Sequence, residues 1–223
     1  MRARWSTVAG LGLVAAYAAL LVGVAVTTSD GDPGPERVEG AGAPDRFVAA
    51  WERSRRATYV TVGTFERRSE VTGSAITSED VVAQRPPRRL HRQLGGVDGR
   101  DDDRLLVCPA PPPGQEDDRE PCRFGAPGGR TYDESVEREV EGLRSIVGGP
   151  DPLYGVAEPG EGCFVLDLRR PDPRAPFGVG ATFCFDAATG ATLRIEVRYE
   201  GGIREVVVVE EVREEVSDED LRP

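Results

Sequence analysis

Apolar and polar residues alternate along several stretches of the chain, a pattern typical of strands with one buried face. In residues 192–199 (TLRIEVRY) the alternation is unbroken, and residues 58–68 place Tyr59 and Phe65 on one side. The Gly201-Gly202 pair favours a hairpin turn before residues 203–212. Weaker strand candidates are residues 76–84, 88–94, 105–108, 154–156, 162–168 and 179–186.

Two stretches carry the three- and four-residue spacing of amphipathic helices. In residues 131–147 the apolar positions are Tyr132, Val136, Val140, Leu143 and Val147, while the remaining positions are mostly charged. A shorter helix is predicted from residue 44 to about residue 56, with Phe47, Ala50 and Trp51 on one face. These helices and the strand candidates together predict an α+β domain over residues 45–223, whose acidic end after Val212 is expected to be exposed.

The amino terminus predicts export. Residues 8–26 are uncharged and mostly apolar, and they follow Arg2 and Arg4. Nineteen residues are close to the roughly 20 that span a bilayer, and the charge bias leaves the amino terminus inside the cell. We therefore predict a membrane anchor at residues 1–28, a flexible tether at 29–44 and a single-pass protein whose domain lies outside the cytoplasm. A cleaved signal peptide is the alternative, since Gly23-Val24-Ala25 offers a small-x-small cleavage site.

The charge pattern argues against nucleic acid as a partner. The formal net charge is −11, and the basic residues are all arginines that alternate with acids along the chain. Nucleic-acid-binding domains instead gather positive charge on one face.

Four cysteines in an exported chain without a CxxC motif favour disulfides over metal ligands or redox thiols. Three pairings are possible, and proximity favours Cys108 with Cys122 and Cys163 with Cys184. The first pair would close an acidic, Pro-rich loop.

Pairing residues 162–168 with 179–186 as antiparallel strands, with Cys163 opposite Cys184, also sets Phe164 opposite Phe183. The apolar side chains of both strands then share one face and the cysteines occupy the other. We predict a curved antiparallel sheet of seven or eight strands, covered on one side by one or two helices. Its concave face would hold a ligand against Phe164, Leu166, Phe183, Phe185, Leu193 and Ile195, under the helical residues Val136, Leu143 and Val147.

These segments resemble a known group of proteins. The order FxxxW, QRPPRRL, YDESVEREVEGLRSIV, YGV, GCFVLDL and FGVGATFCFDAATGA is similar to small exported proteins of actinobacteria. The order of elements more distantly resembles the LolA lipoprotein-localisation proteins and the mycobacterial lipid-binding lipoproteins LppX and LprG. That resemblance implies a half-open β-barrel holding acyl chains, although this sequence lacks a lipidation cysteine after its apolar run and carries what looks like an uncleaved anchor.

Little in the sequence indicates catalysis, a metal or a cofactor. His91 is the only histidine, and neither a GxSxG nucleophile elbow nor a glycine-rich phosphate loop is present. The acidic run from Asp98 to Asp103 does not match a calcium loop and is interpreted as a solvated turn.

Three hypotheses follow from the sequence. The first is a tethered binding protein for a lipid or another hydrophobic ligand, with no enzymatic activity. The second is a ligand-free protein-interaction or sensing module, for which the Cys108–Cys122 loop is a candidate partner surface. The third is a hydrolase, which would require a cluster of acids around His91 in a cleft.

Overall fold

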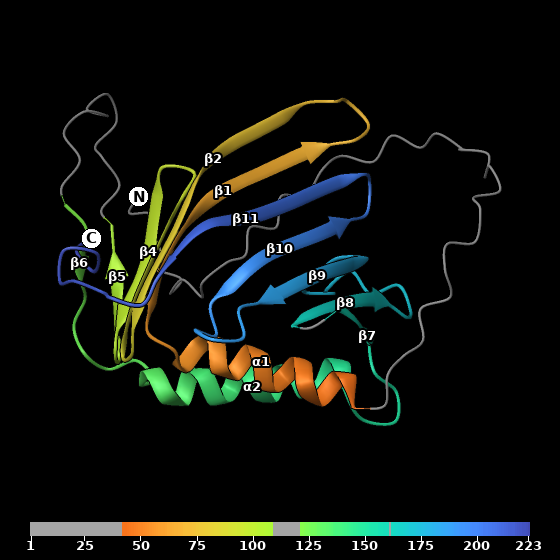
Figure 1. Ribbon diagram of the computed structural model, residues 1–223, viewed down its shortest axis with the longest axis horizontal. Helices are drawn as coiled ribbons and strands as arrows, with labels where there is room; N and C mark the ends of the chain where they lie inside the picture. The colour runs from red at the N-terminus through yellow and green to blue at the C-terminus, as the bar shows by residue number, and fades with distance from the viewer. Residues whose placement is uncertain (1–41, 109–120, 161) are drawn as a thin grey trace, which may run out of the picture. The chain divides into compact units, whose positions relative to one another are not determined.

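The computed structural model describes residues 42–108, 121–160 and 162–223 (Figure 1). The apolar run, nearly all of the predicted tether and most of the Cys108–Cys122 loop lie outside these residues, so anchor, tether and partner surface stay predictions. Neither helix in the described residues is long and apolar enough to cross a membrane. All elements below belong to one compact unit, Arg37–Pro223.

One open antiparallel sheet contains the eleven strands of the described residues, in the order β6-β5-β4-β3-β2-β1-β11-β10-β9-β8-β7. It consists of two meanders, β1 to β6 and β7 to β11, which the pairing of β1 with β11 joins. Helix α1 precedes the first meander and α2 precedes the second. The strands are β1 Tyr59–Ser69, β2 Ala75–Arg85, β3 Arg88–Gln93, β4 Gly96–Asp101, β5 Arg104–Val107, β6 Arg123–Phe124, β7 Tyr154–Gly160, β8 Cys163–Leu168, β9 Gly180–Phe185, β10 Thr192–Tyr199 and β11 Ile203–Arg213.

The sheet is therefore larger than the seven or eight strands predicted. The strands without a sequence signal are β4 and β6, and β4 (GVDGRD) has no run of apolar alternation. It forms because Leu94 and Gly95, with φ of 52° and 70°, make a two-residue turn after β3. Positive φ at both positions is the hairpin geometry that matches strand twist, and it carries part of the acidic run, including Asp98, into the sheet.

A β-bulge adds curvature at the junction of the two meanders. The register between β1 and β11 shifts between Val62 and Gly63, because Val62 pairs with Glu211 and Gly63 with Val209. A side chain at Gly63 would lie 2.2 Å from the carbonyl oxygen of Val208, so only glycine permits this approach. Bulges bend the strand and increase its twist, and the sheet curves around the helices (Figure 1).

Both helices pack on one face of the sheet, which we term the inner face. Helix α1 spans Ala43–Arg56 and α2 spans Tyr132–Val147. The first begins at an N-cap glycine, Gly42, and the second at a capping box of Thr131 and Glu134. Their apolar stripes meet β7 to β10 in one core that includes Phe47, Trp51, Val140, Tyr154, Phe164 and Phe183.

The predicted disulfides are confirmed: Cys108 is bonded to Cys122, and Cys163 to Cys184. Strands β8 and β9 pair as expected, with Cys163 opposite Cys184 and Phe164 opposite Phe183. Alternation places both phenylalanines in the core, as the sequence predicted.

The carboxyl-terminal segment lies on the opposite, outer face and is not fully exposed as expected. Leu221 has no exposed surface and packs on Val60 of β1 and Ala83 of β2. Arg213 pairs with Asp220 at 3.0 Å. Hydrogen bonds from Ser217, together with Arg213, lower the pKa of Asp220 to about 2. The acidic carboxyl-terminal segment is thus held on the outer face by one buried leucine and by the ion pair between Arg213 and Asp220.

Candidate binding site

Seven of the nine predicted ligand-contacting residues lie in the packed core between the helices and the sheet. Each has at most 7% of its surface exposed, and they are Val136, Leu143, Val147, Phe164, Leu166, Phe183 and Phe185. Phe47 and Trp51 of α1 cover this aromatic region, with ring centroids 5.5 and 5.3 Å from that of Phe183. Phe164 and Phe185 also line a hollow of about 220 Å³, and Val147 lines another of about 480 Å³, but most of their surface is packed in the core. We term this part of the inner face, on β7 to β10, the closed half.

A cavity of about 120 Å³ lies beside this core, on the inner face of β1 to β3 and β11 and next to Thr192 and Ile195 of β10; we term this region the open half. Of the other two predicted residues, Ile195 lines the cavity and Leu193 is half-buried outside its lining. The apolar part of the lining is Val82, Ile195, Val207 and Val209, and the polar part is Arg55, Tyr59, Thr61, Asp80, Arg89, His91, Gln93 and Thr192.

The strand register brings the polar residues together in rows. Thr61, Val82 and His91 are successive partners across β1, β2 and β3, and Asp98 of β4 continues that row. The neighbouring row runs from Gly63 through Asp80 to Gln93. Alternate residues of one strand share a face, so both rows point into the open half.

Asp80 is the centre of this polar cluster. It is 4% exposed, and its Oδ1 lies 2.8 Å from His91 Nε2 and accepts a hydrogen bond of 2.7 Å from Gln93 Nε2. The other ring nitrogen of His91 lies 3.5 Å from Asp98 Oδ2. Burial alone would lower the pKa of His91, but the contacts with Asp80 and Asp98 outweigh it and raise that pKa. Burial alone would raise the pKa of Asp98, but its contact with His91 lowers that pKa.

Two arginines approach the cavity from α1 and β3. Arg55 forms an ion pair of 3.0 Å with Glu139 of α2 and lies 4.8 Å above the ring of Trp51. Arg89 is half-buried and forms no direct ion pair in the described residues, although the charge of Asp98 attracts it from a longer distance. Its buried Nε is without a hydrogen-bond partner there. Burial and the nearby charge of Arg55 lower the pKa of Arg89.

Gln84 fixes the end of α1 above the cavity. Its side chain is fully buried, and its Nε2 lies 2.7, 3.0 and 2.8 Å from the carbonyl oxygens of Ser54, Arg55 and Ala57. The carbonyl groups at the end of a helix have no hydrogen-bond donors within the helix. Here the side-chain amide of Gln84 on β2 is their donor. Tyr132 of α2 donates a further hydrogen bond of 2.5 Å to the Arg55 carbonyl.

The sequence carried a signal for this cluster that periodicity analysis of apolar residues missed. Asp80, Gln84, Arg89, His91 and Gln93 occur at even spacing within each predicted strand, which places polar side chains of β2 and β3 on one face. The sequence did not predict that these residues lie near Arg55, because that proximity depends on where α1 packs on the sheet.

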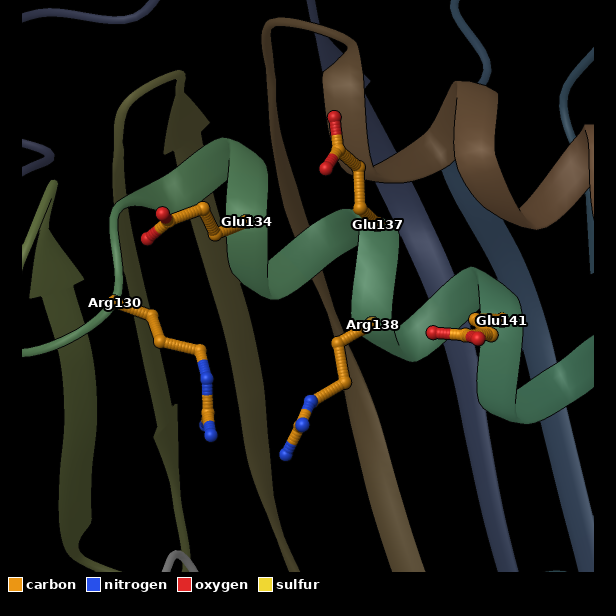
Figure 2. Close-up of a pocket in the computed structure, with 5 residues that line it drawn as sticks. All are labelled: Arg130, Glu134, Glu137, Arg138 and Glu141. Atoms are coloured by element: carbon orange, nitrogen blue, oxygen red, sulfur yellow. The ribbon is translucent and has the colours of Figure 1, made fainter.

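A second hollow, of about 310 Å³, lies on the solvent side of α2 and is lined by Arg130, Glu134, Glu137, Arg138 and Glu141. In Figure 2 the two arginines extend to the same side of the helix. All five residues are exposed and none is apolar, so the hollow offers a ligand no buried surface. In the described residues, no group of three His, Cys, Asp or Glu side chains is placed to hold a metal ion.

No family model and no curated protein matches the chain. Solved structures with a similar fold include MucB in complex with MucA from Pseudomonas aeruginosa, at 17% identity and a TM-score of 0.43, covering 81% of this chain and 61% of that chain. The chain thus spans about three fifths of the MucB chain. A LolA superfamily protein from Nitrosomonas europaea matches at 8% identity and a TM-score of 0.32, covering 80% of this chain and 97% of that chain. A putative outer-membrane lipoprotein-sorting protein domain from Vibrio parahaemolyticus matches at 10% identity and a TM-score of 0.29, covering 80% and 97%. These distant likenesses carry no assignment of activity.

Proposed function

We propose that this protein is an exported, membrane-tethered binding protein that holds a lipid or another partly apolar ligand in the open half of its inner face. It has no enzymatic activity in this proposal. The observation that carries the proposal is the cavity itself, where four aliphatic side chains adjoin a row of polar groups outside the helix-covered core. Ligand pockets combine an apolar lining with a few polar groups that set orientation.

The size of the cavity limits how a ligand can lie. About 120 Å³ is less than the roughly 300–1,000 Å³ typical of pockets for drug-sized molecules. The cavity therefore accommodates one end of a lipid, while the rest of the lipid lies along the inner face of the sheet. This geometry differs from the sequence-based prediction, in which the aromatic residues of β8 and β9 enclose the hydrocarbon chain of the ligand.

Native mass spectrometry with organic extraction tests this proposal on the secreted Arg37–Pro223 unit, which contains the described core and both disulfides. We expect a co-purifying lipid mass, or one acquired from membrane lipids, that Val207→Asp removes. Val208→Asp is the matched control, because Val208 is the next residue on β11, points to the outer face and is 39% exposed. Circular dichroism establishes that both variants are folded.

A protein that stays free of lipid after incubation with membrane lipids would contradict binding in the open half. That result would favour the ligand-free interaction module and move the search to protein partners. Equal loss of lipid in the Val207 and Val208 variants would instead place the lipid elsewhere.

The hydrolase hypothesis is a second candidate, favoured by one observation: His91 lies in a cleft between Asp80 and Asp98. Both ring nitrogens face carboxylates, however, which favours the imidazolium form and leaves no nitrogen free to accept a proton. In the described residues, no Ser, Thr or Cys side chain forms a hydrogen bond with His91.

An assay of ester and glycoside hydrolysis with wild type and His91→Ala tests this second candidate. We expect the two proteins to give the same background rate. A wild-type rate that falls at least tenfold in the variant would establish His91 as a catalytic group and contradict the non-enzymatic proposal.

A further inference from the structure

Among the basic residues that line the cavity, only Arg89 lacks a direct ion pair in the described residues. Arg55 is neutralised by Glu139 at 3.0 Å, and His91 is paired with Asp80 at 2.8 Å. Arg89 is the third basic residue of the lining, and in the described residues it has neither a direct ion pair nor a hydrogen-bond partner for its Nε. Asp98, on the neighbouring strand β4, attracts Arg89 electrostatically, but its direct contact is with His91 and its side chain is 67% exposed.

Arg89 is placed to contact a ligand in the cavity, because it lines the cavity and is partly shielded from solvent. Arg89 follows Tyr59 and Gln84 in the row across β1, β2 and β3, next to the row that contains Val82. A half-buried guanidinium without a partner is costly, because removing a charge from water is unfavourable unless another group replaces the water. An anion at this point would supply both the missing charge and hydrogen-bond acceptors.

One side of the same cavity, formed by residues of β11 and by Ile195, is aliphatic. Val207 and Val209 of β11 and Ile195 of β10 face Arg89 across the open half. A molecule that satisfies both sides has a negatively charged end and a hydrocarbon chain. The guanidinium fork matches the oxygens of a carboxylate or a phosphate group.

We propose that the ligand is a single-chain anionic amphiphile whose carboxylate or phosphate head binds Arg89 and whose chain lies on the valines of β11. This inference rests on the proposed function and names the chemical class of the ligand. Arg55 supports the site from the side, and its own pairing with Glu139 keeps it from neutralising the head by itself. Arg89 is thus a binding residue that sets specificity for charge.

Isothermal titration calorimetry of the folded Arg37–Pro223 unit tests the proposal with four probes below their aggregation limits. Oleate and a lysophosphatidate represent the two anionic heads, oleyl alcohol lacks the charge, and inorganic phosphate lacks the chain. We expect the two anionic lipids to bind about tenfold or more tightly than oleyl alcohol, from the roughly 1.5–3 kcal/mol of a charge-assisted hydrogen bond. The tighter of the two anionic lipids identifies the head group.

Arg89→Gln should remove this preference, because glutamine keeps polarity and loses charge. Anionic lipids should then bind about as weakly as oleyl alcohol, whose affinity should stay within about twofold of wild type. Arg89→Lys should restore part of the preference. Arg88→Gln is the matched control, because Arg88 is the preceding residue on β3, points to the outer face and pairs with Asp101 at 3.1 Å.

Thermal unfolding provides a second readout. Without ligand, Arg89→Gln should unfold at the wild-type temperature or higher, since it removes an unpaired half-buried charge. Oleate should raise the unfolding temperature of the wild type and leave that of the variant unchanged.

The outcomes separate the two proposals. Equal binding of oleate and oleyl alcohol to the wild type would overturn the anionic head and leave the lipid-binding function standing. Binding of none of the lipids would overturn both. Binding of phosphate as tight as that of the lysophosphatidate would overturn the amphiphile and indicate a site for small anions.

Discussion

The closed and open halves of the inner face belong to one sheet with one pattern of alternation, yet they differ in chemistry. In the closed half, α1 and α2 cover Phe164, Phe183 and their neighbours, and the side chains there are almost all apolar. In the open half the helices end, and the cluster of Asp80, His91 and Arg89 shares the face with valines. Full cover requires apolar residues, because buried polar groups need partners. Partial cover permits polar groups that pair with one another or with a ligand.

The largest expected effect concerns the closed half. Phe183→Ala should lower the free energy of unfolding by about 3–5 kcal/mol, as for other buried phenylalanines, because Phe183 is 2% exposed and contacts Phe47, Trp51 and Phe177. Urea denaturation measures this difference. Val207→Ala in the open half is the matched comparison, and equal losses would show that the two halves are packed alike.

Removal of the Cys163–Cys184 disulfide, which closes a loop with a sequence separation of 21, should cost about 3 kcal/mol on the chain-entropy estimate. The Cys108–Cys122 disulfide on the other meander has a separation of 14, and the same estimate gives a cost smaller by about 0.4 kcal/mol. Paired Cys→Ala variants and urea denaturation measure both costs. A much larger cost for the first pair would indicate that it also fixes the β8–β9 register.

The hydrogen bonds from Gln84 of β2 to the end of α1 should contribute less to stability. Gln84→Leu keeps the volume and leaves the carbonyl groups at the end of α1 without their donor, which should cost about 1–3 kcal/mol. Hydrogen exchange should show faster opening of the last turn of α1, whereas α2 should keep its protection. Unchanged exchange in that turn would mean that Tyr132 alone secures it.

The smallest expected effect is a pH dependence within the polar cluster. The pKa of His91 is raised, so its contribution to stability is complete below its unfolded value of about 6.5 and is lost as the pH rises through the higher folded value. The lowered pKa of Asp98 acts on the acidic side: that contribution is present above the unfolded pKa and is lost as the pH falls through the folded one.

Urea denaturation of wild type and His91→Gln at pH 5, 7 and 9 measures the part that belongs to His91. The stability difference between the two proteins should shrink toward pH 9. A difference that grows with pH would mean that neutral His91 is the form the fold favours. His91 is the only histidine of the chain, so no second imidazole contributes to this comparison.

Local spacing in the sequence determined much of the fold. The apolar stripe predicted α2 at Tyr132–Val147, and the alternation predicted β10 at Thr192–Tyr199. The cysteine positions predicted the register of β8 and β9. Each of these depends on residues a few positions apart, or on one covalent bond, so the chain itself carries the information.

Tertiary structure decided what covers each face. Phe47 and Trp51, more than a hundred residues away from the aromatic strands, occupy the space above them, and Leu221 returns to β1 across the outer face. Asp80, His91 and Arg89 become one site only when β2 and β3 pair in register and the end of α1 packs beside them. Alternation states which residues share a face, whereas the element that covers that face depends on contacts between segments distant in sequence. The sequence therefore determined the two faces, and the arrangement of helices over the sheet decided which part of the inner face became core and which part stayed open.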